Sequence, residues 1–189
     1  MDQTKIPVWK TAQSQHIADC RVFQVRRDTS IDPRNERQYD FFVIEAADFI
    51  NVIPLTPEGQ VVLIEQYRHG TGEVTLEIPG GLVDEGESSL VAAKRELLEE
   101  TGYITNDVRL LGRTRPNPAI QNNCLYSFVA LNCTLSHSQT YDDSEHIAVR
   151  LVDWTQIPTL IASGTIDHAL VVTTFYLFDQ KRGDMKIPA

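Results

Sequence analysis

The sequence predicts an α+β fold built from packed layers of strands and helices. Segments rich in β-branched and aromatic residues recur along the chain, which is typical of strands. One segment has a helical spacing of apolar residues with capping residues at both ends, and two further helical segments close the chain. Because strands and helices are interleaved within 189 residues, we expect one layered domain with a small appendage.

The amino-terminal part is predicted to form a small sheet of its own. Residues 16–27 and 37–46 have the composition of strands, and the intervening segment 28–36 is rich in turn-forming residues. We therefore expect an amino-terminal strand region over residues 1–46 and a larger domain over residues 47–189.

A second pair of strands is predicted over residues 48–55 and 60–67, joined by the turn sequence TPEG. The second of these strands contains the apolar run VVLI, which does not alternate and therefore indicates a strand buried on both faces. A shorter strand over residues 74–78 should stop at the following PGG.

The clearest helix is predicted over residues 88–101. Ser88 or Ser89 can cap its start, and Gly102 can end it. Its apolar face is expected to consist of Leu90, Ala93, Leu97 and Leu98. The remaining elements are predicted strands near residues 107–114, 124–133 and 147–153 and predicted helices near residues 155–162 and 167–181.

Composition and charge argue against several classes of ligand and several cellular locations. A formal net charge of -9 argues against a protein that holds a nucleic acid or another polyphosphate with basic residues alone. An anionic ligand would need another source of positive charge, and a divalent metal ion is the simplest one. The cysteines form no CxxC pair, the amino terminus lacks a signal-peptide core, and no apolar run has the length of a membrane helix. We therefore expect a cytoplasmic protein that binds neither nucleic acid nor membrane.

Three glutamates lie on one face of the predicted helix. Glu96, Glu99 and Glu100 stand at positions i, i+3 and i+4, so their carboxylates project from the same side. They occupy the last turns, where the helix dipole is already negative, and this placement disfavours folding. A bound divalent cation would reverse that cost, because Mg²⁺ prefers oxygen ligands. The alternative is a solvated acidic face, with Lys94 and Arg95 nearby.

The spacing of the surrounding residues favours the metal site. Residues 80–103, GGLVDEGESSLVAAKRELLEETGY, resemble the Nudix signature G-x5-E-x7-R-E-U-x-E-E-x-G-U, in which U is a bulky aliphatic residue. The segment departs from the signature only at its last position, where Tyr103 replaces the aliphatic residue. The matching residues are Gly81, Glu87, Arg95, Glu96, Leu97, Glu99, Glu100 and Gly102.

This resemblance implies a reaction, a cofactor and a role for each motif residue. Nudix hydrolases cleave a nucleoside diphosphate linked to another moiety, with water as nucleophile and Mg²⁺ or Mn²⁺ as cofactor, and more than one ion is expected here. The family fold is an α/β/α sandwich around a mixed sheet. Glu87 and Arg95 would form a structural ion pair, and Gly81 and Gly102 would permit sharp backbone turns. The implied metal ligands are the Gly80 carbonyl and the carboxylates of Glu96, Glu99 and Glu100.

Two stretches outside the signature resemble the ADP-ribose pyrophosphatase branch of the family. They are LIEQYRHG over residues 63–70 and EIPGGLVDEGES over residues 77–88. Pro118 lies fifteen positions after Tyr103, and a proline near that offset marks hydrolases of ADP-ribose and related nucleotide sugars. Pro118 is therefore assigned to the substrate-binding loop, with a simple turn-forming role as the alternative.

The same branch implies a homodimer in which the amino-terminal strands exchange between subunits and contribute to the nucleotide site. Arg68 is the expected phosphate contact, because a guanidinium can bind two phosphate oxygens at once. An ion pair of Arg68 with Glu65 or Glu77 is the alternative.

A catalytic acidic residue is implied on a loop late in the chain. Glu145 is the first candidate for the base and Asp143 the second, and Glu99 is a third. The sequence thus predicts a hydrolase that converts a nucleoside diphosphate sugar to a nucleoside monophosphate and a sugar phosphate. ADP-ribose is the leading substrate, and GDP-mannose and other nucleotide sugars follow. The alternatives are a hydrolase of nucleoside triphosphates or dinucleoside polyphosphates, and a Nudix module that binds ADP-ribose without cutting it.

Overall fold

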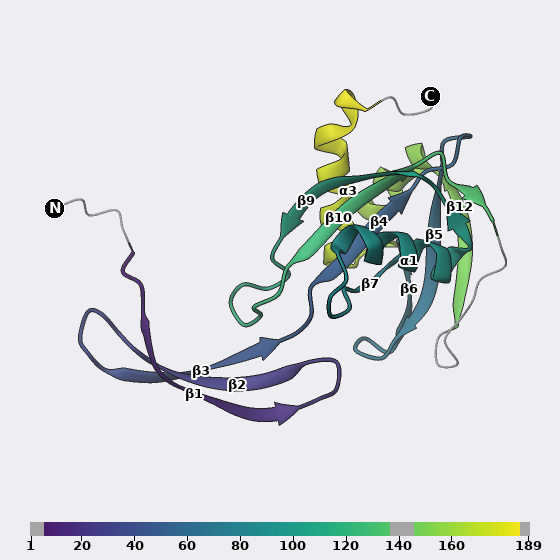
Figure 1. Ribbon diagram of the computed structural model, residues 1–189. Helices are drawn as coiled ribbons and strands as arrows, with labels where there is room; N and C mark the ends of the chain where they lie inside the picture. The colour runs from purple at the N-terminus through teal and green to yellow at the C-terminus, as the bar shows by residue number, and fades with distance from the viewer. Residues whose placement is uncertain (1–5, 137–145, 186–189) are drawn as a thin grey trace. The chain divides into compact units, whose positions relative to one another are not determined.

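The computed structural model describes residues 6–136 and 146–185, and the chain divides into two compact units (Figure 1). Unit 1 comprises Met1–Ala47 and Arg115–Asn123, and unit 2 comprises Asp48–Thr114 and Cys124–Ala189. The later segment of unit 1 carries Pro118. None of the helices within the described residues is long and apolar enough to cross a membrane.

Unit 1 is built on an antiparallel sheet in the order β1-β2-β3, with β1 (Lys10–Asp19), β2 (Gln24–Ile31) and β3 (Gln38–Glu45). The predicted single strand over residues 16–27 is wrong, because the chain reverses between β1 and β2. In that turn Arg21 has a positive φ of 67°, and the N–H of Cys20 donates to the carbonyl of Phe23. The segment that carries Pro118 lies along β3, where the N–H of Ile44 donates to the carbonyl of Ile120 at 2.7 Å.

Unit 2 contains a mixed sheet in the order β7-β4-β10-β9, an antiparallel sheet in the order β12-β5-β6, and the short pair β8 and β11. The first sheet is mixed because β4 and β10 run parallel, whereas β7 is antiparallel to β4 and β9 is antiparallel to β10. The strands of unit 2 are β4 (Phe49–Pro54), β5 (Gln60–Arg68), β6 (Glu73–Glu77), β7 (Gly80–Leu82), β8 (Tyr103–Ile104), β9 (Asp107–Thr114), β10 (Leu125–Leu131), β11 (Thr134–Leu135) and β12 (Ile147–Asp153).

The strands β4 and β5 follow one another in sequence but belong to different sheets. The one β-bridge near them joins Leu55, which follows β4, to Val61 of β5, so the predicted pairing of these two strands is wrong. The physical reason is that both edges of β4 are taken by β7 and β10, whereas β5 pairs with β12 and β6. The VVLI run in β5 is at most 1% exposed, which confirms the prediction of a strand buried on both faces.

The helices of unit 2 are α1 (Ser89–Thr101), η1 (Trp154–Gln156), α2 (Ile157–Ala162), α3 (Ala169–Lys181) and η2 (Arg182–Asp184). The predicted caps of α1 are present: the Ser88 side chain accepts from the N–H of Val91, and Gly102 takes a left-handed φ of 74°. The predicted apolar face is partly wrong, because Leu90 and Leu98 are exposed. The helix packs closely on the sheet through small side chains. Its buried residues are Ala92, Ala93, Leu97, Glu100 and Thr101.

The mixed sheet carries α1 on one face and α3 on the other (Figure 1). Ile50 and Val52 of β4 pack in one buried cluster with residues of α1, and Ile53 packs in the other with residues of α3. This alternation along β4 is what a strand covered on both faces requires. The predicted α/β/α arrangement around a mixed sheet is therefore confirmed.

Candidate active site

The site is centred on Gly80 and Gly81 in the edge strand β7. The N–H of Val52 donates to the carbonyl of Pro79 at 2.9 Å. Hydrogen-bonded and non-hydrogen-bonded pairs alternate along an antiparallel ladder, so the next pair, Asn51 and Gly80, is a non-hydrogen-bonded one. Both the N–H and the carbonyl of Gly80 therefore point to the open edge of the sheet, where other groups can reach them.

Two glutamates of α1 contact this pair of glycines. The N–H of Gly80 donates to Oε2 of the buried Glu100 at 2.9 Å. The carboxylate of Glu96 lies against Gly81 so closely that a Cβ at position 81 would collide with it. Two of the three predicted metal-ligating carboxylates thus lie beside the backbone that carries the predicted carbonyl ligand.

Arg95 connects the helix to the preceding loop and to the glutamate cluster. Its Nε and one terminal nitrogen donate to the two carboxylate oxygens of Glu87 at 3.1 and 3.0 Å. Its other terminal nitrogen donates to Glu96 at 2.7 Å and to Glu99 at 3.2 Å. The hydrogen bonds from Arg95 lower the pKa of Glu87, and the hydrogen bonds to Glu87, Glu96 and Glu99 raise the pKa of Arg95. This guanidinium therefore balances part of the negative charge of the cluster.

The donor set is one that suits a hard divalent cation, because Glu96, Glu99, Glu100 and the Gly80 carbonyl offer only oxygen atoms. Within residues 6–136 and 146–185, no three acidic, histidine or cysteine side chains converge in the arrangement of a metal cage. The contacts of Arg95 account for this, since Glu96 and Glu99 are turned toward its guanidinium. Binding a cation would require these carboxylates to exchange that partner.

Arg68 forms an ion pair with Glu77, one of the two acidic partners considered from the sequence. Its Nε and one terminal nitrogen donate to the two oxygens of Glu77 at 2.7 and 2.8 Å, and the Thr75 hydroxyl donates to Glu77 at 2.6 Å. Burial alone would raise the pKa of Glu77, but these hydrogen bonds outweigh it and hold that pKa below its usual range. The other acidic partner considered, Glu65, pairs with Arg150 instead, and its Oε1 lies 3.4 Å from a terminal nitrogen of that guanidinium. The phosphate contact of Arg68 stays a prediction.

Three other predicted site residues are placed elsewhere or not placed. Glu145 and Asp143 lie outside the described residues. Pro118 belongs to unit 1, whereas the glutamate helix belongs to unit 2. Their parts in the site stay predictions.

Asn51 is a residue of this region that the sequence pattern does not single out. It lies opposite Gly80 in register, and its carboxamide fills the space that a side chain at position 80 would need. The only local signal was a carboxamide inside the otherwise apolar stretch FINVIP.

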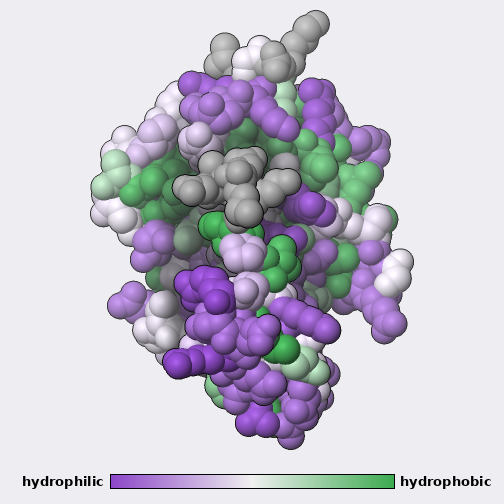
Figure 2. All heavy atoms as spheres, turned by 90° about the vertical axis from the view of Figure 1, so that its left-hand side faces the viewer, coloured by the Kyte–Doolittle hydropathy of each residue, from purple (hydrophilic) through white to green (hydrophobic). Residues whose placement is uncertain are grey.

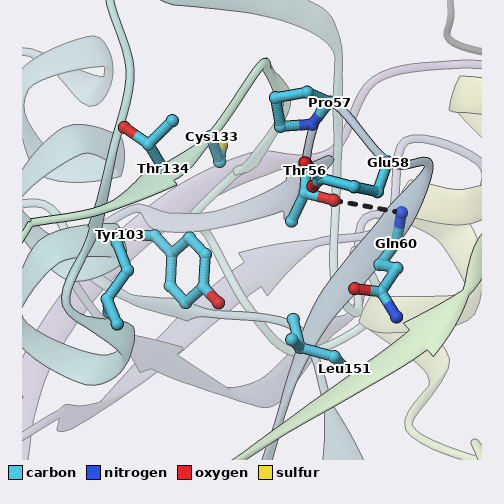
Figure 3. Close-up of a pocket in the computed structure, with 9 residues that line it drawn as sticks. Thr56, Pro57, Glu58, Gln60, Tyr103, Cys133, Thr134 and Leu151 are labelled. Atoms are coloured by element: carbon cyan, nitrogen blue, oxygen red, sulfur yellow. Dashed lines mark hydrogen bonds between the residues drawn. The ribbon is translucent and has the colours of Figure 1, made fainter.

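A hollow of about 240 Å³ lies elsewhere in unit 2 (Figure 3). Thr56, Gln60, Tyr103 and Leu151 line it together with Cys133, whose pKa burial raises to about 12. A thiol with that pKa stays protonated at neutral pH and is a poor nucleophile. Because none of the motif glutamates lines this hollow, the glutamate cluster remains the candidate active site.

The chain is similar in sequence and fold to several known proteins. Residues 47–175 match the NUDIX domain family. The chain is 30% identical over 121 residues to the methanol dehydrogenase activator of Bacillus methanolicus, a match that covers 64% of this chain and 65% of that protein. It therefore spans slightly less than two thirds of that relative.

Two further similarities concern ADP compounds. The chain is 25% identical over 128 residues to the ADP-ribose pyrophosphatase of Bacillus subtilis (strain 168), covering 67% of this chain and 69% of that protein. A solved structure described as that of an ADP compounds hydrolase matches with a TM-score of 0.84 and 22% identity, covering 97% of this chain and 99% of the other. At that identity the structural likeness shows the fold alone.

Proposed function

Because the chain belongs to the Nudix family, as its sequence signature predicts, we propose that it is a metal-dependent hydrolase of nucleoside diphosphate sugars, with ADP-ribose as the leading substrate. The products would be a nucleoside monophosphate and a sugar phosphate. The observation that carries the proposal is the placement of Glu96 and Glu100 against the Gly80–Gly81 backbone at an open sheet edge. The similarity to an ADP-ribose pyrophosphatase supports the choice of substrate.

The metal would be held by the carboxylates of Glu96, Glu99 and Glu100 and by the Gly80 carbonyl. Mg²⁺ fits this all-oxygen set, Mn²⁺ is the alternative, and more than one ion is expected. When bound, such an ion neutralises phosphate oxygens and lowers the pKa of a bound water. In the protein, Glu100 also anchors the Gly80 N–H, so the same side chain fixes the backbone that carries the carbonyl ligand.

Arg68 is the candidate for holding the diphosphate. The Arg68 side chain is 41% exposed, whereas that of Glu77 is 3% exposed. The guanidinium is therefore accessible at the surface, and the carboxylate that holds it is buried. A guanidinium held by two hydrogen bonds has a fixed plane, and this preorganisation favours recognition of phosphate oxygens. The base that collects the proton of the attacking water is Glu145, Asp143 or Glu99.

Unit 1 supports the proposal of a homodimer. Among its described residues no hydrophobic side chain is buried, whereas several large ones are exposed, including Phe42 at 57%. Figure 2 shows hydrophobic areas interspersed with hydrophilic ones on the visible face. A sheet without a buried core is not stable alone and needs another surface to cover it. A second copy of this sheet is the proposed cover, and exchange of the strands between subunits is part of the same proposal.

Hydrolysis of a panel of substrates tests the proposed function. ADP-ribose, GDP-mannose, UDP-glucose, a diadenosine polyphosphate and a nucleoside triphosphate would each be incubated with the protein, Mg²⁺ and a coupled phosphatase, and the released phosphate measured. We expect the nucleotide sugars to be preferred, with ADP-ribose first, and EDTA to abolish the activity reversibly. Preference for the polyphosphates would contradict the substrate class. If no phosphate is released from any substrate while ADP-ribose still raises the melting temperature, the protein is a binding module instead.

A further inference from the structure

The two glycines of β7 are flanked by polar side chains on both faces of the sheet. On the face that packs against α1, the Glu96 carboxylate occupies the space beside Gly81. On the opposite face, the Asn51 carboxamide occupies the space beside Gly80, and a Cβ there would collide with its oxygen. The Glu96 contact is part of the proposed metal site, whereas nothing in the Nudix signature accounts for Asn51.

Asn51 is an unusual side chain for its position in the sheet. It is 8% exposed, and its neighbours Ile50 and Val52 are fully buried. Its Nδ2 is buried and has no hydrogen-bond partner among the described residues. Burying an amide donor without a partner disfavours folding, and an apolar residue such as valine would fit a buried strand without that cost. The presence of asparagine here is explained if its Nδ2 donates to a bound group that the folded chain itself does not supply.

A neighbouring buried polar residue, Ser127, has a hydrogen-bond partner inside the protein, unlike Asn51. Ser127 of β10 is in register with Asn51 and is fully buried as well. Its hydroxyl lies 2.9 Å from the hydroxyl of Thr174 in α3, so its hydrogen-bonding need is met inside the protein. Asn51 differs from Ser127 in two ways: its donor is left over, and it packs on the glycine whose carbonyl faces the open edge.

We propose that Asn51 is a positioning residue of the metal and diphosphate site. Its carboxamide packs on Gly80 and fixes the carbonyl that would serve as a metal ligand, and its Nδ2 would donate to an oxygen atom held near that carbonyl by the metal ion. The oxygen belongs to a metal-bound water or to a phosphate of the substrate. This inference rests on the proposed function, because it takes the Gly80 carbonyl as a ligand.

The test compares Asn51→Val with Ser127→Ala in the full chain. The first variant removes the unpaired donor and the contact with Gly80. The second removes a buried polar group from the same face of the adjacent strand, and the Thr174 hydroxyl keeps its bond to the Leu170 carbonyl. Melting temperatures would be measured in EDTA and in Mn²⁺, and the affinity for Mn²⁺ would be titrated by electron paramagnetic resonance. Asn51→Ala serves as a second variant if valine distorts the strand.

We expect Asn51→Val to melt in EDTA at or above the wild-type temperature, because it removes an unsatisfied buried donor. Its affinity for Mn²⁺ should nevertheless fall about 10-fold or more, as for residues that orient metal ligands, and its stabilisation by Mn²⁺ should shrink. Ser127→Ala should keep the wild-type affinity.

The outcomes separate this inference from the proposed function. A wild-type protein that binds Mn²⁺, together with Asn51 variants that bind it equally well, would overturn the role of Asn51 and leave the proposed function standing. Variants that melt lower in EDTA but keep the wild-type affinity would show that Asn51 only packs the strand, which also overturns its role. A wild-type protein that does not bind Mn²⁺ would overturn the metal site and this inference together.

Discussion

The carboxylate of Glu96 occupies the space beside the Cα of Gly81, so that no side chain fits at position 81 without moving it. The backbone of Gly81 has no positive φ, and therefore its lack of a side chain, not its conformational freedom, is what the site uses. The requirement for glycine at this motif position is thus a requirement for a close approach between the edge strand and the helix.

Gly81→Ala should lower kcat/KM by about 10- to 100-fold, because displacement of a ligand by about 1 Å is enough to cost that much. The fold should survive, since alanine is compatible with the backbone there. The matched control is Gly183→Ala, where an added Cβ meets nothing within 4 Å. Steady-state kinetics with ADP-ribose and circular dichroism of both variants check this. A Gly81→Ala protein with wild-type kcat/KM would show that the position of Glu96 is not critical.

Glu100→Gln should lower turnover by at least ~100-fold, because a neutral carboxamide is a weaker metal ligand than a carboxylate and the metal ion would supply the transition-state stabilisation. The fold should remain intact, because the glutamine side-chain oxygen can still accept from the N–H of Gly80. The measurement is kcat with ADP-ribose in saturating Mg²⁺, with the melting temperature in EDTA as the check on folding. Equal activity in the variant would refute the assignment of Glu100 as a metal ligand.

The sequence predicted well those features that local patterns determine. The helix α1 starts one residue after its predicted start and ends where predicted, since Ser88 and Gly102 cap it. Strands β9 and β12 have the predicted bounds. The turn between β1 and β2 was missed because its positive φ is carried by Arg21, and no glycine, proline or asparagine marks it.

Features that depend on contacts distant in sequence could not be predicted in this way. The partners of β4 come from elsewhere in the chain, and the adjacent β5 is not one of them. The register of β5 and β6 places Glu77 on the same face as Arg68, opposite Ile64, whereas Glu65 lies on the other face, although the residue directly opposite Arg68 is Glu73. The buried position of Asn51 beside Gly80 likewise depends on how β7 is added to β4.

Phe42→Glu should convert the proposed dimer to a monomer. Phe42 is exposed on a sheet that has no buried hydrophobic core among its described residues, and a charge there would oppose burial against a second copy. Gln38→Glu adds one charge to the same strand near its exposed start and is the control. Molar masses from size-exclusion chromatography with light scattering decide the matter. A wild-type monomer, or a Phe42→Glu protein that remains dimeric, would exclude this surface.

Arg68→Met should destabilise the protein at neutral pH by about 1–3 kcal/mol, because it leaves the buried Glu77 carboxylate without its charged partner. The control is Arg150→Met. The ion pair of Arg150 with Glu65 is exposed, and its loss should change the free energy of unfolding by about 0–1 kcal/mol. Urea unfolding at neutral pH gives both values. If the two variants were equally stable, the Arg68–Glu77 pair would not contribute to the fold.

The effect of Arg68→Met should depend on pH, and its sign follows from the pKa of Glu77. In the wild-type protein burial raises this pKa, but the hydrogen bonds from Arg68 and Thr75 lower it by more. A carboxylate with a depressed pKa stabilises the fold above its unfolded pKa, and this stabilisation is lost as the pH falls through the folded pKa. Without Arg68 the effect of burial would dominate, and the pKa of Glu77 would rise. Protonation of Glu77 would then remove the cost of burying its charge in the variant. The difference in unfolding free energy between the two proteins should therefore be largest near neutral pH and shrink as the pH falls through the folded pKa of Glu77 in each protein. A difference that stayed constant over this range would show that the guanidinium acts through packing and not through its charge.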